Sequence, residues 1–289
     1  MRRILLALAT GVALLCPSLP AEAAIIGPTD DWKPLAQGAR ALGISNKMVN
    51  RILAAGLEVM CPGSTHDNGG VLNGWFLGGD TSSFYTNAHG VIDIGRTDHK
   101  ANFIEPLDQC GVKSYRDLAA NGAKATPYPI SVPENRRQME LASFEPQSDS
   151  PMRDRAKLRL LRSIAGAQAL ALPDFDNIRL AVGEEVILVS LKPPMMREPE
   201  IQSCHIQSIN MSGRIGPGQL FTDCDNGFGN SAGLYFVRDP SDPTMLLPIA
   251  LHEGSHERVG DHQPWDASKN TALGIMLGRG FFAFGGKAS

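Results

Sequence analysis

The chain has 289 residues, of which 43% are hydrophobic and 20% are charged, and its formal net charge is −3. It lacks the basic surplus that binding to a phosphate backbone requires, so nucleic acid is excluded as an expected partner. The length allows one large all-β domain or two barrels with well-buried interiors.

The first 23 residues have the pattern of a secretion signal. Arg2 and Arg3 precede an apolar run from Ile4 to Cys16, and Ala21-Glu22-Ala23 offers a small-x-small cleavage site. The apolar run is too short to span a bilayer of about 30 Å. We therefore expect an exported protein, periplasmic or extracellular, with no membrane contact after signal removal. The sequence makes no prediction of the oligomeric state.

A helical lead-in and then short strands follow along the chain. Between Leu35 and Val59 apolar residues recur every three to four positions, which is typical of helix. From Gly69 onward, β-rich runs are broken by Gly, Pro, Asn and Asp. These runs are Val71–Leu77, Ser83–Thr86, Val186–Leu191, Gln202–Asn210, Leu234–Val237 and Met245–Leu251. Many short strands favour a β-barrel or sandwich over alternating βαβ units.

One further strand stands out by its alternation. Ala156, Leu158 and Leu160 share one face of it, and basic residues occupy the other. The following segment, Ser163–Asn177, is rich in Ala, Gly and Pro and is expected to connect two halves of the molecule.

Four cysteines remain after signal removal, an even number in a chain expected in an oxidising compartment. They are Cys61, Cys110, Cys204 and Cys224. None has the spacing of a zinc site, so no metal is expected. Three disulfide connectivities are possible, and we favour Cys61 with Cys110 and Cys204 with Cys224, which close local loops.

Three segments supply the parts of a serine hydrolase. In Gly229–Gly233, the glycine two positions before Ser231 permits a tight turn that aims the backbone N–H groups of Gly229 and Ser231 at a developing oxyanion. His89 follows a β-rich run and is placed to act as the base, and Asp154, at the head of the alternating strand, would fix its tautomer.

The acid has two competitors in the sequence. Asp174 and Asp176 precede Asn177-Ile178-Arg179-Leu180, but Asp154 heads the clearer strand and is preferred.

These segments carry a family resemblance. T-N-A-H-G at 86–90 resembles the T-A-A-H-C block of trypsin-like serine proteases, D-R-A-K-L-R-L from Asp154 their D-x-A-L-L block, and G-N-S-A-G at 229–233 their G-D-S-G-G block. The G-N-S pattern is most similar to the bacterial branch that contains the glutamyl endopeptidases. The resemblance implies an all-β fold of two six-stranded antiparallel barrels, with the active site in the cleft between them and no cofactor.

The expected organisation is a signal peptide at 1–23, a helical lead-in at 24–58, a first barrel at 59–165 with His89 and Asp154, and a second barrel at 166–289 with Ser231. The implied activity is that of a serine endopeptidase, which cleaves peptide bonds in a protein or peptide substrate through an acyl-enzyme.

Three departures from the family pattern matter. Gly90 removes the disulfide beside the histidine, and Ala232 adds a methyl group beside the nucleophile. Asn230 replaces the aspartate that pairs with a freed N-terminal ammonium, and it carries no charge. Ile25-Ile26-Gly27 resembles the I-V-G-G start of activated trypsins, but without that aspartate we do not expect it to supply an activating amine.

Two residues point to opposite substrate preferences. Asp225, six positions before Ser231, lies where trypsins favour Arg or Lys. His252 resembles the histidine with which glutamyl endopeptidases hold an acidic side chain. No side-chain preference is therefore predicted.

Two other functions fit parts of the sequence. Gly90 and Ala232 leave open a catalytically impaired two-barrel protein that serves as a binding or scaffold module. G-x-S-x-G with His252 downstream is also compatible with an α/β-hydrolase esterase. That fold needs a helix directly after the serine, whereas Leu234–Val237 has the pattern of a strand.

Overall fold

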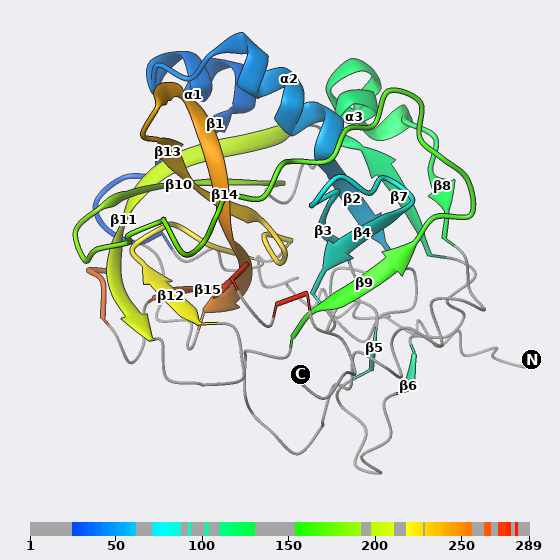
Figure 1. Cartoon of the computed structure of the whole chain (residues 1–289). Helices are drawn as coiled ribbons and strands as arrows, with labels where there is room; N and C mark the ends of the chain where they lie inside the picture. The colour runs from blue at the N-terminus through cyan, green and yellow to red at the C-terminus, as the bar shows by residue number, and fades with distance from the viewer. Residues whose placement is uncertain are drawn as a thin grey trace, which may run out of the picture.

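The computed structural model describes residues 25–61, 71–87, 92–93, 102–103, 110–130, 154–191, 198–210, 218–227, 229–255, 263–266, 271–278 and 281–282. The fold is mostly β: two curled sheets lie side by side, and helices α1, α2 and α3 lie across one end (Figure 1). The expected two-barrel architecture is confirmed. The predicted signal peptide lies outside the described residues.

The C-terminal sheet closes into a six-stranded barrel, which we call the second barrel. Its strands follow the order β11-β10-β13-β14-β15-β12, and β12 pairs back onto β11, so the ring has no open edge. Short strand β1 pairs with the edge of β11 that faces away from β10. The strands are β1 (Lys33–Pro34), β10 (Glu185–Leu191), β11 (Pro199–Asn210), β12 (Gln219–Thr222), β13 (Leu234–Asp239), β14 (Asp242–Ser255) and β15 (Ala272–Met276).

The N-terminal sheet, which we call the first barrel, curls without full pairing. Its order is β8-β7-β2-β3-β4-β9, and its edges meet at one bridge between Ile130 and Leu160. Strands β5 (Ile92–Asp93) and β6 (Asn102–Phe103) pair separately. The barrel strands are β2 (Gly56–Met60), β3 (Val71–Trp75), β4 (Ser83–Thr86), β7 (Gly111–Ser114), β8 (Tyr128–Pro129) and β9 (Ala156–Arg159).

The helices are α1 (Leu35–Ala41), α2 (Asn46–Ala55) and α3 (Tyr115–Asn121), with a 3-10 turn at Gly122–Lys124. The helix prediction for Leu35–Val59 is correct for α1 and α2, which a turn at 42–45 separates, and wrong beyond Ala55, because Gly56–Met60 forms β2. Glycine disfavours helix continuation, and both edges of this segment find partners in β3 and β7.

One hydrophobic core joins the two barrels. Along β10, Leu188 belongs to the core inside the second barrel, whereas Ile187 and Val189 belong to a cluster shared with the first barrel. The rings of Trp75 on β3 and Phe236 on β13 meet edge to face, with centroids 6.2 Å apart. The interface between the barrels is therefore packed like a domain interior.

Both predicted disulfides are present. Cys61 bonds to Cys110 within the first barrel, and Cys204 bonds to Cys224 within the second. Among the described helices, none has the length and apolar character needed to cross a membrane.

The two disulfides should stabilise the protein to different extents. They close loops with sequence separations of 49 and 20 residues. Replacing each pair by alanine should lower the free energy of unfolding by about 4 and about 3 kcal/mol, respectively, because the longer loop gains more chain entropy. Urea denaturation of the two double variants checks this, and equal stability of the wild type with and without reductant would contradict it.

Candidate active site

Ser231 lies on a tight turn where the second barrel meets the first. It is partly exposed, whereas its neighbours Asn230 and Ala232 are buried. The Ser231 carbonyl accepts hydrogen bonds from both the backbone N–H and the side-chain amide of Asn73 on β3, each 2.9 Å long. The turn of one barrel is thus bonded directly to a strand of the other.

The turn is also bonded to β14. The Ala232 N–H donates to the His252 carbonyl, and the His252 N–H donates to the Gly233 carbonyl, both at 2.7 Å. Within the turn, Gly233 N–H donates to the Asn230 carbonyl at 2.7 Å. These bonds fix the path of the backbone on both sides of Ser231.

Two residues of the turn have left-handed backbone conformations. Gly229 has φ of 83°, which costs a glycine little, and Ala232 has φ of 57°. For a residue with a Cβ this conformation costs about 1–2 kcal/mol. The alanine that departs from the family's glycine therefore occupies a position that favours glycine, and Trp75 Nε1 bonds its carbonyl at 2.7 Å.

Asn230 anchors the turn on β10. Its side-chain amide donates to the Ser190 hydroxyl at 3.0 Å and to the Leu191 carbonyl at 2.6 Å. The Asn230 side chain is thus committed to neutral hydrogen bonds inside the protein.

Asn73 satisfies several buried groups at once. Its amide nitrogen lies 2.9 Å from the Ser190 hydroxyl and 3.0 Å from the Gly229 carbonyl. Its side-chain oxygen accepts from Leu191 N–H at 2.9 Å and from the Tyr115 hydroxyl. Burial raises the pKa of Tyr115, which keeps this hydroxyl protonated as a donor. Sequence reasoning missed Asn73, although a polar residue within an apolar strand is a signal.

Asp154 lies just before β9, beside the end of β4 whose Thr86 bonds to Asn73. Thr86 of β4 pairs with Ala156 of β9, and the Thr86 hydroxyl donates to the Asn73 carbonyl at 2.6 Å. The Asn87 amide donates to the Asp154 carbonyl at 2.9 Å. Contacts through Thr86 and Asn73 thus link the neighbourhood of Asp154 to Ser231. The third predicted catalytic residue, His89, lies outside the described residues.

A second carboxyl group, which the sequence reasoning missed, interacts with Asp154. Burial, and then the charge of Asp154, raise the pKa of Glu253 to about 9. Glu253 follows His252 on β14, so it reaches Asp154 from the opposite barrel. Its signal in the sequence is an acidic residue directly after the histidine of the family-like block.

The Asp225 carboxylate binds the N-terminal segment. Its oxygens accept from Ile26 N–H at 2.7 Å and from Asp31 N–H at 3.0 Å. Burial raises the pKa of Asp225 to about 6, although these N–H groups act to lower it. Ile26 is therefore held by Asp225 and not by Asn230, and a cationic substrate side chain would have to compete with two backbone donors. The pocket role of Asp225 stays a prediction.

His252 is fully buried in the second barrel. Its Nδ1 lies 2.9 Å from the Tyr235 hydroxyl, and burial raises the pKa of Tyr235, which keeps the hydroxyl protonated. The role of His252 in binding an acidic substrate side chain stays a prediction.

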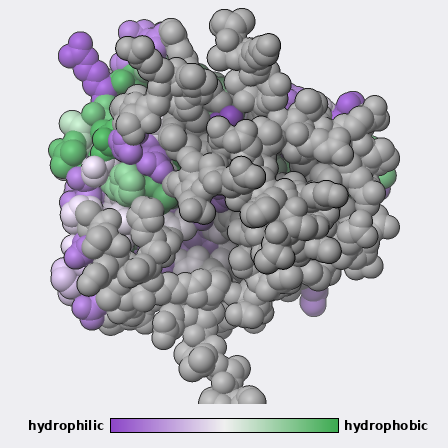
Figure 2. All heavy atoms as spheres, turned by 90° about the horizontal axis from the view of Figure 1, so that it is seen from below, coloured by the Kyte–Doolittle hydropathy of each residue, from purple (hydrophilic) through white to green (hydrophobic). Residues whose placement is uncertain are grey.

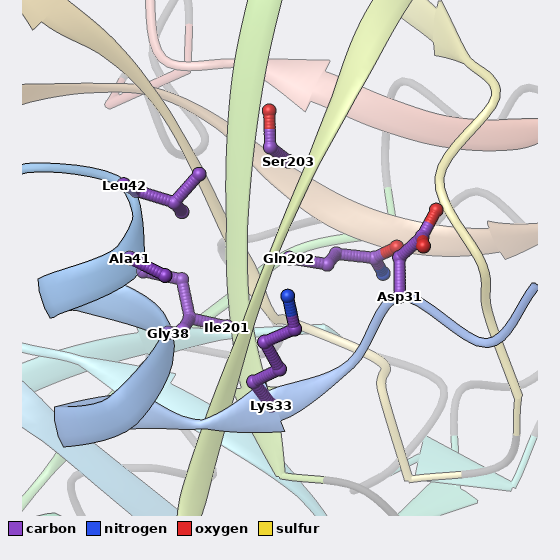
Figure 3. A pocket seen from close by; sticks show the side chains of 8 residues that line it. All are labelled: Asp31, Lys33, Gly38, Ala41, Leu42, Ile201, Gln202 and Ser203. Carbon is purple, nitrogen blue, oxygen red and sulfur yellow. The ribbon is translucent and has the colours of Figure 1, made fainter.

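A pocket of about 200 Å³ lies elsewhere, between α1, β1 and β11 (Figure 3). Its lining contains none of the predicted site residues. The lining residues are Asp31, Lys33, Gly38, Ala41, Leu42, Ile201, Gln202 and Ser203.

On the face drawn in Figure 2, hydrophobic side chains gather among hydrophilic ones on the side of the second barrel. Within the described ranges, no cluster of three or more His, Cys, Asp or Glu could hold a metal ion.

Comparison with known proteins shows the fold. No protein-family model and no curated protein matches the sequence. The structure is similar to that of a Glu endopeptidase in complex with MPD, with a TM-score of 0.55 and 12% identity over 89% of this chain and 95% of that one. It also matches the apo MamO protease domain from Magnetospirillum magneticum, with a TM-score of 0.45 and 13% identity over 78% and 93%. The two-barrel protease fold is confirmed, and the glutamyl endopeptidase branch stays a prediction.

Asn73 provides a direct test of this site. Asn73→Leu should lower the free energy of unfolding by about 3 kcal/mol or more, because it leaves several buried donors and acceptors unpaired. Asn50→Leu on the exposed face of α2 is the matched control and should change stability by less than about 0.5 kcal/mol. Equal effects of the two substitutions in urea denaturation would show that Asn73 is not what holds the turn.

Proposed function

We propose that this protein is an exported serine endopeptidase, in which Ser231 is the nucleophile, His89 the general base and Asp154 the acid that orients it. The observation that carries the proposal is the placement of Ser231 on a hydrogen-bonded turn at the interface of the barrels, where its carbonyl bonds to Asn73 of β3. Asn73 accepts in turn from Thr86, at the end of β4 beside Asp154. The likeness in fold to a Glu endopeptidase supports it.

Chain connectivity supports His89 as the base. Asn87 bonds to the Asp154 carbonyl, and His89 is two residues further along the chain. This short separation along the chain from a residue bonded to Asp154 supports the choice of His89 as the partner of that acid.

The turn favours an oxyanion site. The Asn230 carbonyl accepts from Gly233 N–H inside the protein. Because the C=O and N–H of a trans peptide point in opposite directions, the Ser231 N–H is directed away from that buried side. In the proposal, this N–H and that of Gly229 hold the oxyanion.

The proposed reaction is acyl transfer. Ser231 Oγ attacks the scissile carbonyl while His89 takes its proton, and His89 returns the proton to the leaving amine as the C–N bond breaks. Water then attacks the acyl-enzyme by the same route, which releases the acid and restores the Ser231 hydroxyl. The two disulfides support an oxidising compartment, in agreement with the signal-like N-terminus.

The α/β-hydrolase alternative is not supported. Strand β13 follows the Ser231 turn directly, where that fold requires a helix.

The nucleophile is tested by Ser231→Ala. This variant should lose labelling by a fluorophosphonate and all peptidase turnover while unfolding at the same urea concentration, because the bonds to Asn73 are made by the Ser231 backbone carbonyl. Ser241→Ala, on an exposed turn, is the matched control and should label normally. Undiminished turnover in Ser231→Ala would discard the mechanism, and an unlabelled wild type would favour the scaffold alternative.

The base is tested by pH. An imidazole titrates near pH 6.5, and only its neutral form accepts a proton, so the rate of labelling should rise through about pH 6 to 8. Labelling rates measured between about pH 5 and 8 check this, and a flat profile would rule out a histidine base.

A further inference from the structure

Glu253 occupies an irregular position on β14, next to the turn that carries Ser231. The preceding residue, His252, bonds that turn through both its N–H and its carbonyl. In the pairing of β14 with β15, His252 is opposite Gly274 and Gly254 is opposite Leu273, so Glu253 is an extra residue without a partner. Such bulges redirect side chains, often beside functional sites.

The bulge directs Glu253 toward the other barrel. The His252 ring lies inside the second barrel against Tyr235, with ring centroids 5.7 Å apart. A bulge interrupts the regular alternation of side chains and re-aims the extra one, so Glu253 does not have to follow the His252 ring into the barrel interior. Among the described residues, Asp154 of the first barrel is the charged group whose field raises the pKa of Glu253. The neighbouring Arg155 lies over the Phe281 ring, 5.4 Å from its centroid.

One oxygen of the Glu253 carboxyl group is enclosed, although the residue as a whole is only partly buried. Its Oε2 atom is buried, and among the described residues it has no hydrogen-bond partner. An enclosed, ionised carboxylate beside a second carboxylate is strongly unfavourable, whereas a protonated carboxyl group can donate to the other. If the two neighbouring carboxyl groups share one proton, the repulsion between two carboxylates is avoided and the buried oxygen gains a hydrogen-bond partner.

We propose that Glu253 is a positioning residue of the active site, whose protonated carboxyl group donates a hydrogen bond to the Asp154 carboxylate. This inference rests on the proposed function. The bond holds Asp154 in one orientation, so that it faces His89 as the acceptor of the imidazole N–H. Each barrel thereby contributes one carboxyl group to the support of the base.

The arrangement predicts a second limb in the pH profile. Because the pKa of Glu253 is raised to about 9, the proton is held at neutral pH and lost in alkali. Loss of the proton places two carboxylates side by side and breaks the bond that orients Asp154. Activity should therefore fall above about pH 9 for a reason separate from the rise through the His89 titration.

Two substitutions of Glu253 test this with fluorophosphonate labelling rates. Glu253→Gln keeps a donor without a titrating proton, so it should label within about threefold of wild type at pH 7 and lack the alkaline fall. Glu253→Leu keeps the size but not the donor and should label at least about tenfold more slowly. Glu184→Gln, on an exposed loop, is the control and should keep the wild-type profile. An alkaline fall that persists unchanged in Glu253→Gln would overturn the proposal.

A stability measurement separates this proposal from the function itself. The folded state keeps a proton on Glu253 that the unfolded chain releases above its ordinary pKa, so wild-type stability should decline as pH rises from about 4.5 to about 9. Glu253→Gln should show a shallower decline in urea denaturation. If wild type is not labelled at all, the proposed function fails, and equal pH dependence of the two stabilities would by itself refute the shared proton.

Discussion

The architecture of the candidate active site depends on one buried amide. Asn73 is fully enclosed on β3 of the first barrel, and its hydrogen bonds end on β10 and on the Ser231 turn of the second. A buried amide is tolerated only when its donors and acceptors are satisfied, and here most partners come from the other barrel. The turn can therefore adopt this geometry only when the two barrels are docked, which couples the proposed catalytic geometry to the tertiary fold.

The same constraint explains why Ser231 is presented outward. Asn230 and Ala232 turn into the protein, where β10, β14 and Trp75 hold them. With both neighbours fixed, the residue between them has little freedom to move. A nucleophile held by rigid strands and buried polar contacts is preorganised, which lowers the cost of reaching the reactive geometry.

The sequence predicted the parts of the fold that follow from local pattern. Ser83–Thr86 coincides with β4, and the alternation after Asp154 coincides with β9. Both disulfides followed from loop closure. The end of the lead-in helix was misplaced, because apolar spacing in Leu57–Val59 fits either a helix or a strand. The hydrogen bond from Ile26 to Asp225 joins residues 199 positions apart and uses a backbone donor, so no pattern of side chains could have predicted it. The Glu253 bulge depends on strand register, which is set by tertiary pairing.

The most direct test of the account is a crystal structure of the protein after reaction with a fluorophosphonate. We expect phosphorus bonded to Ser231 Oγ, its oxygen facing the N–H groups of Gly229 and Ser231, and the His89 imidazole about 3 Å from both that Oγ and the Asp154 carboxylate. A His89 ring on another side of the molecule, or a phosphonate attached to a different residue, would contradict the convergence of these three side chains.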